Sequence, residues 1–168
     1  VHAPQDVEVI IVTGDRDELQ LIDKRTKVYY TKRGISDIHI FDEAEFAANY
    51  EGLVPKQLIE LKGLMGDTSD NIPGVPSIGE KTATNLIVAY GSIENAYAHL
   101  NEIKPPRAQK ALAEHYDLAQ MSKELATINI HSPFELDMEQ ARMTDLYTTA
   151  DSEGEIALEP YETKVYQI

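Results

Sequence analysis

The stretch GDTSDNIPGVPSIGEKTA, residues 66–83, divides this 168-residue chain into two regions of different character. It is dense in Gly, Pro, Asp and Ser, which favour turns, and its last four residues can begin a helix. Gly74 and Gly79 permit a tight turn, after which the backbone N–H groups at the start of the next helix can reach a phosphate. A hairpin between two helices that binds no ligand would have the same spacing, so the spacing alone leaves both interpretations open.

The same stretch nearly matches the pattern G-x-x-x-x-G-K-[ST] of nucleotide-binding loops. One extra residue, Glu80, separates Gly79 from Lys81, and the segment before the stretch is predicted to be a helix and not a strand. We therefore expect contacts with a DNA backbone and not a nucleotide cradle, with Lys81 adding a charge and Thr82 a hydroxyl donor.

The residues before this stretch predict an α/β region. Three short runs rich in β-branched and aromatic residues are typical of strands: residues 7–12, 27–31 and 37–41. A short helix is expected at 18–22, and longer helices are expected at 42–50 and 56–65. Asp42, with Glu45 three residues later, forms a capping box for the first of the longer helices.

After the stretch, the pattern is helical. Helices are predicted at residues 80–90, from 92 to about 103, and, as one helix or two, over 107–126. Gly91 ends the first of them, and Ser92 can cap the second. We therefore expect an α/β fold with an incomplete sheet and flanking helices, followed by an all-helical part. The expected domains are residues 1–65, 66–132 and 133–168.

The composition excludes several classes of protein. There is no Cys, which rules out disulfide scaffolds, thiolate zinc sites and cysteine nucleophiles. No apolar run is long enough for a transmembrane helix, so we expect a cytoplasmic location and no membrane partner. A net charge of −14 is unusual for a protein that binds nucleic acid, but residues 133–168 carry much of the acidic excess. We expect most of residues 148–168 to be loosely ordered or to depend on a partner for their order.

The first acidic motif is Gly14-Asp15-Arg16-Asp17, which follows the first predicted strand. Functional sites in parallel α/β sheets gather at the carboxyl ends of strands. Two carboxylates at this spacing could bind a hard cation such as Mg²⁺ and leave positions for water and phosphate oxygens. The alternative is an Asp-rich turn in which Asp17 caps the short helix.

The second acidic motif is the pair Asp67 and Asp70 at the end of a predicted helix. The two carboxylates could face the same way if this turn is helical. The alternative is an Asx-type turn that only caps the helix. Neither acidic motif decides between metal binding and a structural role by itself.

Taken in order along the chain, the motifs resemble the 5′-nuclease domain of bacterial DNA polymerase I, a branch of the flap-endonuclease family. The resemblance extends from about Val7 to about Asp137. The segments that carry it are VTGDRD at 12–17, LQL at 19–21, the stretch at 66–83 and YGS at 90–92.

The resemblance implies a mixed sheet flanked by helices and a helix–three-turn–helix, or helix-hairpin-helix-like, element. It also implies an active site in which carboxylates hold two divalent ions, Mg²⁺ or Mn²⁺. The implied catalytic and metal-binding residues are Asp15, Asp17, Asp67 and Asp70. The implied DNA-binding residues are Gly74, Val75, Ser77, Ile78, Gly79, Lys81 and Thr82. In relatives, carbonyl groups of this turn also hold K⁺.

The implied activity is that of a 5′-3′ exonuclease or 5′-flap endonuclease in DNA replication and repair. It would cleave phosphodiesters of DNA with a 5′ flap or nick, or of an RNA primer, in a parent chain that also carries a polymerase domain. The family's other metal-binding acids, its helical arch and its first strand precede the segment seen here, so we expect the chain alone to be nearly inactive. Ser77 stands where many relatives have Gly, which is a mild change if its φ is negative.

Two other functions remain open at this point. One is a non-catalytic module that binds duplex DNA with the hairpin element only. The other is a metal-dependent phosphatase acting on small molecules, which would leave residues 74–83 without a purpose.

Overall fold

The computed structural model describes residues 8–32, 37–131 and 133, together with the backbone of three short strands near the C-terminus. The chain forms two compact units, one spanning Ala3–Ile130 and one made of His131–Ile168 with Val1–His2. Each unit is described by itself.

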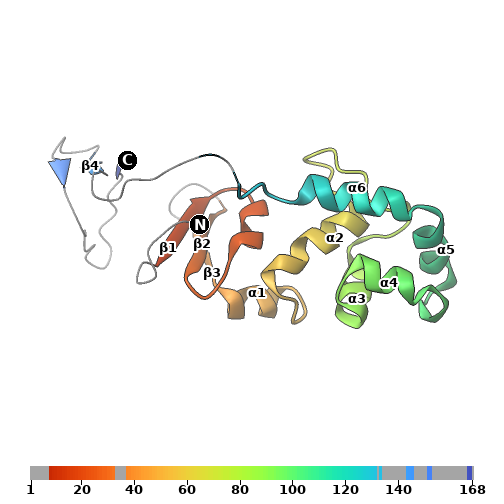
Figure 1. Cartoon of the computed structure of the whole chain (residues 1–168). Helices are drawn as coiled ribbons and strands as arrows, with labels where there is room; N and C mark the ends of the chain where they lie inside the picture. Colours follow the sequence, from red (N-terminus) through yellow and green to blue (C-terminus); the bar gives the residue numbers. More distant parts are fainter. Residues whose placement is uncertain are drawn as a thin grey trace. The chain divides into compact units, whose positions relative to one another are not determined.

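The first unit begins with a three-stranded mixed sheet in the order β1-β2-β3 (Figure 1). The strands are β1 (Val9–Thr13), β2 (Thr26–Thr31) and β3 (Ile38–Phe41). β1 pairs with β2 in parallel, and β2 pairs with β3 antiparallel. The strand predictions are confirmed to within two residues at each end. The short helix expected at 18–22 is a 3₁₀ helix, η1 (Asp17–Leu21).

The two faces of this sheet differ. On one face, Val28 lies opposite Phe41 and both are buried in the hydrophobic core. Residues on the other face alternate with them, as the period of two in a strand requires, and are half-buried in β2 and exposed in β1 and β3. The exposed apolar residues of this face are Ile10, Val12, Ile38 and Ile40.

Six α-helices follow the sheet within the described part of the chain. They are α1 (Glu43–Asn49), α2 (Leu58–Met65), α3 (Glu80–Tyr90), α4 (Ile93–Ala98), α5 (Pro106–Glu114) and α6 (Tyr116–Ala126). The 3₁₀ helix η2 (Pro55–Gln57) precedes α2, and the 3₁₀ helix η3 (Leu100–Glu102) follows α4. Asp42 caps α1 by accepting a hydrogen bond from the Glu45 N–H at 2.8 Å, as predicted. The segment 107–126 contains two helices, because the chain leaves the helical conformation at His115.

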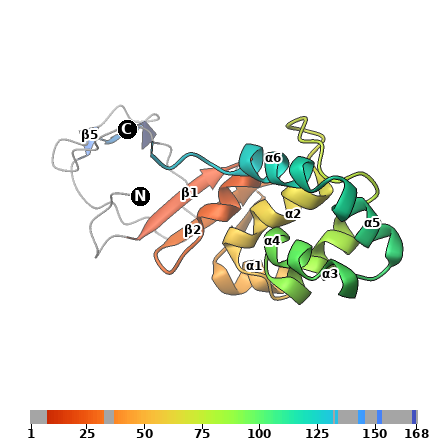
Figure 2. The same cartoon turned by 45° about the vertical axis from the view of Figure 1, so that its right-hand side comes forward.

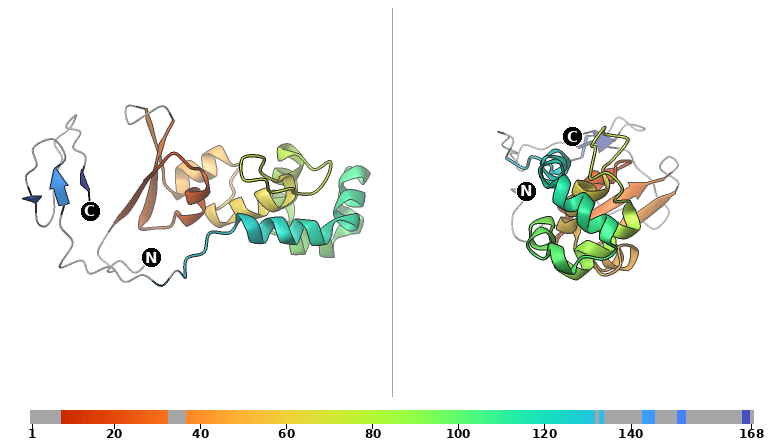
Figure 3. Two further views of the ribbon diagram at one scale, coloured as in Figure 1. Left: turned by 90° about the horizontal axis from the view of Figure 1, so that it is seen from above. Right: turned by 90° about the vertical axis from the view of Figure 1, so that its right-hand side faces the viewer.

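Helix α2 lies at the centre of the helical part, with α6 alongside it and α3 and α4 on another side (Figures 2 and 3). Gly63 allows α2 to lie close to its neighbours. A Cβ atom at this position would lie 2.6 Å from Ile93 Cδ1 and 3.2 Å from the Ala119 carbonyl oxygen. The close packing places the C-terminal end of α2, and the turn that follows it, in a fixed position.

A buried glutamine ties the end of α6 to the α/β part. The Gln20 side chain donates to the Ala126 carbonyl oxygen at 3.0 Å and accepts from the Ile128 N–H at 3.0 Å. Because Gln20 belongs to η1, these bonds also fix the segment that carries Asp17.

The second unit contains a small sheet with β4 (Met143–Asp145) in the middle. Its neighbours, β5 (Asp151–Ser152) and β6 (Tyr166–Gln167), both pair with β4 antiparallel. The sequence did not predict these strands, and most of the segment 148–168 expected to be loosely ordered lies outside the described residues. None of the helices in the described residues is both long and apolar enough to cross a membrane.

Candidate functional site

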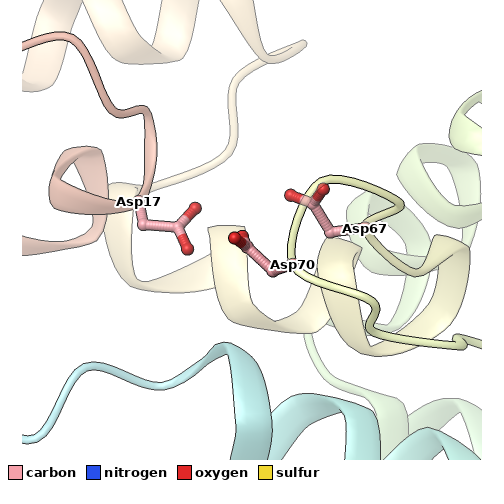
Figure 4. Close-up of side chains that lie close together, drawn as sticks. All are labelled: Asp17, Asp67 and Asp70. Carbon is pink, nitrogen blue, oxygen red and sulfur yellow. The ribbon is translucent and has the colours of Figure 1, made fainter.

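Three of the predicted carboxylates lie together at one end of α2 (Figure 4). Asp17 is the first residue of η1, whereas Asp67 and Asp70 belong to the turn that follows α2. Each offers one oxygen, and these oxygens all lie within 4.8 Å of one another. The two acidic motifs, far apart in the sequence, therefore meet in space.

Asp15 is close to this cluster but is engaged differently. Its Oδ1 accepts a hydrogen bond from the Asp17 N–H at 2.9 Å, and its own N–H donates to Thr13 Oγ1 at 3.0 Å. Asp15 lines the same cavity as the cluster without being one of its three members. The alternative in which Asp17 caps the short helix is wrong, since η1 has no side-chain cap and the Asp17 carboxylate faces the cluster.

The backbone of the turn after α2 fixes Asp67. Its N–H and carbonyl exchange hydrogen bonds with Ile72 at 2.9 and 2.8 Å. Its Oδ1 accepts from the Ser69 N–H at 2.9 Å, so the Asx-type turn considered above is present as well. Gly74 closes the turn with φ of 63°, and a Cβ there would lie 2.2 Å from the Gly66 nitrogen. Only glycine fits this position without moving the backbone.

Lys62 of α2 is the site residue that the sequence reasoning missed. Its side chain is 7% exposed and its Nζ lies 2.7 Å from Asp67 Oδ2 and 3.8 Å from Asp70 Oδ2. It also forms an ion pair and hydrogen bond with Asp17 Oδ1. Its one sequence signal is that Lys62 and Glu60 are the charged residues of an otherwise apolar helix, LIELKGLM. Charged residues on such a helix are rarely buried unless they are paired.

The Lys62 ammonium and the Ser69 side-chain and backbone donors stabilise the charged form of Asp67. Together they lower the pKa of this carboxyl from 3.8 to about 2. Asp67 therefore remains ionised at any pH near neutrality, which is the state that a metal ligand requires.

The cluster opens on a cavity of about 540 Å³. Part of its wall is aromatic, formed by Tyr30 and Tyr50, and the Arg16 guanidinium lies 5.3 Å from the centroid of the Tyr30 ring. Burial raises the pKa of the Tyr50 hydroxyl. The cavity is thus lined by carboxylates, two tyrosine rings and a guanidinium, and it has room for a phosphate group.

The predicted DNA-binding turn follows directly. Val75 and Ile78 are buried in the core, so only their backbone groups could face a ligand. Two hydrogen bonds hold the turn to α6 and α2. The Gly74 N–H donates to the buried Ser122 Oγ at 3.0 Å, and the Val75 N–H donates to the Leu64 carbonyl at 2.7 Å. The start of α3 is therefore rigidly placed beside the carboxylate cluster.

Two expectations about this turn need correction. Ser77 has φ of 72°, in the left-handed region that favours glycine, so the presence of Ser there is not a mild change. The Arg107 guanidinium donates to Ser77 Oγ at 3.1 Å and helps to hold it. Gly79 has φ of −95° and does not make the tight turn possible; a Cβ there would meet no protein atom within 4 Å. In the first turn of α3, Lys81 is exposed and Thr82 is half-buried.

Comparison with known proteins identifies the family. Residues 53–149 match the model of the family described as 5′-3′ exonuclease, C-terminal SAM fold. The chain belongs to this family. The resemblance inferred from the sequence and the expected fold class are therefore confirmed, as is the family context of nucleases and DNA polymerase I.

The sequence is similar to that of longer bacterial proteins. It is 43% identical over 151 residues to DNA polymerase I of Bacillus caldotenax, covering 90% of this chain and 17% of that protein. It is 43% identical over 129 residues to DNA polymerase I of Bacillus subtilis, covering 77% of this chain and 14% of that protein. The chain thus spans about a sixth of the length of these relatives.

The fold is similar to solved phage nuclease structures. T5 5′-exonuclease with bound divalent metal ions (zinc) matches with a TM-score of 0.62 at 22% identity, over 71% of this chain and 42% of that one. The flap endonuclease of bacteriophage T5, in a pseudo-enzyme-product complex with DNA and metal ions, matches with a TM-score of 0.61 at 21% identity, over 71% of this chain and 42% of that one. At this level of identity the likeness shows the shared fold.

Proposed function

We propose that this chain supplies part of the active site of a metal-dependent 5′-3′ exonuclease and 5′-flap endonuclease. The observation that carries the proposal is the convergence of Asp17, Asp67 and Asp70 beside the turn at 74–82, in a chain of the 5′-3′ exonuclease family. The proposed substrates are DNA with a 5′ flap or nick and RNA primers, and the proposed setting is replication and repair in the bacterial cytoplasm. We also propose that the parent chain carries a polymerase domain, as the similarity to DNA polymerase I suggests.

The residues present fit a divalent cation. Carboxylate oxygens are the ligands that Mg²⁺ and Mn²⁺ prefer. The position between the three carboxylates already accepts a positive charge, the Lys62 ammonium. Asp17, Asp67 and Asp70 would hold the metal directly, and Asp15 would hold it through water. In such a site a pair of ions supplies an activated water and charge stabilisation at the phosphate.

The chain's own residues would bind and orient the DNA. The backbone N–H groups at the start of α3 lie at the exposed Gly79, where the missing side chain leaves room for a phosphate. Lys81 adds a charge and Thr82 a hydroxyl, while Gly74, Val75, Ser77 and Ile78 contribute the shape and backbone groups of the turn. Carbonyl groups of the same turn are the proposed K⁺ site. These contacts read the phosphates and not the bases.

We further propose that the chain alone cleaves only slowly. Two ions held a few ångströms apart need several carboxylates to bridge and neutralise them. The described residues bring three carboxylates together, with Asp15 nearby. Residues from elsewhere in the nuclease domain would complete the set.

The test is cleavage and binding of a labelled 5′-flap DNA with Mg²⁺ or Mn²⁺. We expect the chain to bind duplex DNA and to cleave the flap slowly, with cleavage lost in Asp67→Ala and binding retained. Binding that persists with no metal-dependent cleavage in a complete nuclease domain carrying this chain would instead support the non-catalytic DNA-binding module. Absence of duplex binding would contradict the proposal.

The phosphate-binding role of α3 has its own test. Lys81→Ala should weaken binding similarly across DNA sequences and lower the slope of log K against log salt concentration by about 1. Lys110→Ala is a suitable control, since this lysine is exposed and pairs with Glu114 one turn further along α5. A loss of affinity that depends on the DNA sequence would contradict a phosphate contact.

A further inference from the structure

Lys62 lies where the proposed cation would lie. Its ammonium contacts all three converging carboxylates, those of Asp17, Asp67 and Asp70. Its side chain is 7% exposed, against 19% for Asp17 and Asp67 and 47% for Asp70, so it is the least exposed of the four. A lysine at the outer edge of the cavity, with no role in the cluster, would have an exposed side chain.

The electrostatics explain why the ammonium is held there. Three carboxylates with oxygens within 4.8 Å of one another repel, and a positive charge placed among them offsets that repulsion. A buried ammonium is costly to desolvate unless acidic groups surround it. The Lys62 ammonium and the carboxylates therefore stabilise one another. One ammonium among three ionised carboxylates leaves a net charge of −2. That excess is the charge that a divalent cation would neutralise.

The ammonium and a metal ion cannot use these oxygens in the same way at the same time. A Mg²⁺ ion binds oxygen at about 2.1 Å, and its charge repels an ammonium at the same centre. The lysine side chain has a flexible four-carbon stem, and Lys62 lies one turn from the end of α2, beside the cavity. The ammonium can therefore move into the cavity when the carboxylates bind a metal ion in its place.

We propose that Lys62 is a built-in substitute for the metal: its ammonium holds the three carboxylates together in the metal-free chain and is displaced into the cavity when a divalent cation binds. This inference rests on the proposed metal site. The displacement of the Lys62 ammonium then has two consequences. It sets the apparent affinity for metal by competition, and metal binding delivers a positively charged group to the cavity, where a DNA phosphate would lie.

The displacement can be measured in the unaltered 168-residue chain by acetylating its amines with and without Mg²⁺ and quantifying each lysine by mass spectrometry. We expect labelling of Lys62 to be slow in the metal-free chain and several-fold faster with saturating Mg²⁺. Labelling of the exposed Lys81 and Lys110 should not change, which controls for reagent reactivity. Labelling of Lys62 that stays constant or slows while Mg²⁺ is bound would overturn the inference.

The competition can be measured by calorimetric titration of Mn²⁺ into Lys62→Met, which keeps an unbranched side chain, one atom shorter, and removes the charge. We expect Mn²⁺ to bind about tenfold more tightly than to the wild-type chain, and we expect the metal-free variant to melt at a lower temperature. Lys56→Met is the matched control, since Lys56 is exposed just before α2 and is not among the residues that contact the three carboxylates.

The outcomes separate this inference from the proposed function. If Mn²⁺ binds the wild-type chain, loses affinity in Asp67→Asn and binds Lys62→Met no more tightly, the metal site stands and the role of Lys62 is refuted. If Mn²⁺ affinity is the same in Asp67→Asn as in the wild-type chain, the proposed metal site itself is refuted, and the role of Lys62 with it.

Discussion

Helix α2 contributes to two ion clusters that differ in what surrounds them. Lys62 contacts the carboxylates of Asp17, Asp67 and Asp70. Two residues earlier, Glu60 lies on another side of the helix and forms an ion pair with Lys123 of α6 at 2.7 Å. Lys123 also forms an ion pair with Glu94 at 2.8 Å. Each cluster is built around one lysine, but three carboxylates surround the first and two surround the second.

The difference between them indicates which cluster is structural. In the Lys123 cluster, Glu60 uses its second oxygen to accept from the Ile93 N–H at 3.0 Å, and Lys123 is satisfied by its two acidic partners. This cluster joins α2, α4 and α6 and leaves a charge of −1. The Lys62 cluster leaves a charge of −2 and opens on a cavity. The larger excess of negative charge, on a cavity, favours the binding of a divalent cation, whereas the Lys123 cluster carries the smaller excess and links three helices.

The largest expected effect is on stability at the structural cluster. Lys123→Met removes the partner of the buried Glu60 carboxylate, and we expect a loss of about 3 kcal/mol in the free energy of unfolding. Urea denaturation followed by circular dichroism measures it. Lys110→Met, at an exposed pair, is the control and should change stability by less than about 0.5 kcal/mol. A similarly small loss in Lys123→Met would mean that the two clusters are not as different as their surroundings indicate.

The next largest effect on stability is expected at Gly74, in the turn beside the Lys62 cluster, where no side chain fits. Gly74→Ala forces a Cβ to within 2.2 Å of the Gly66 backbone nitrogen at a positive φ, and we expect about 2 kcal/mol of destabilisation. Gly79→Ala is the matched substitution, since its Cβ would meet nothing and its φ is negative. It should leave stability within about 0.5 kcal/mol of the wild-type value and weaken duplex DNA binding. Equal destabilisation by the two substitutions would contradict the described geometry of the turn.

A smaller effect concerns pH at the Lys62 cluster. The pKa of Asp67 is about 2 in the folded chain against 3.8 ordinarily, so its ionised form stabilises the fold above about pH 4. This contribution is lost as the pH falls from about 4 through about 2. Because Asp67 lies in the wall of an open cavity, where solvent screens its charge, we expect this contribution to be about 1 kcal/mol. Urea titrations of the wild-type chain and Asp67→Asn should converge over this range of pH; a constant gap between the two would show that Asp67 gains nothing from its charge.

The fold could be predicted from the sequence because its signals are local. The β-branched runs predicted the strands, and Asp42, Gly91 and Ser92 marked helix ends where the structure has them. The convergence of Asp17 with Asp67 could not be derived from spacing, since it depends on how η1 packs against α2. It became an expectation only through the resemblance to a family.

Lys62 and the turn show what local patterns leave out. A lysine in a helix is ordinarily solvated, and only the tertiary arrangement places its ammonium among carboxylates. The positive φ of Ser77 and the extended conformation of Gly79 likewise do not follow from residue type, which gives a preference while the surrounding contacts decide. The catalytic and metal-binding roles of the four aspartates, the DNA-binding residues and the three-domain division stay predictions.

The central claim is that Asp17, Asp67 and Asp70 form a divalent metal site. The most direct measurement is a crystal structure of the chain grown with Mn²⁺, with anomalous diffraction data that locate the metal. We predict an anomalous peak at bonding distance from oxygens of these three carboxylates, with the Lys62 ammonium moved away from them. A well-diffracting crystal in which Mn²⁺ binds elsewhere, while Lys62 keeps its place among the carboxylates, would contradict the account.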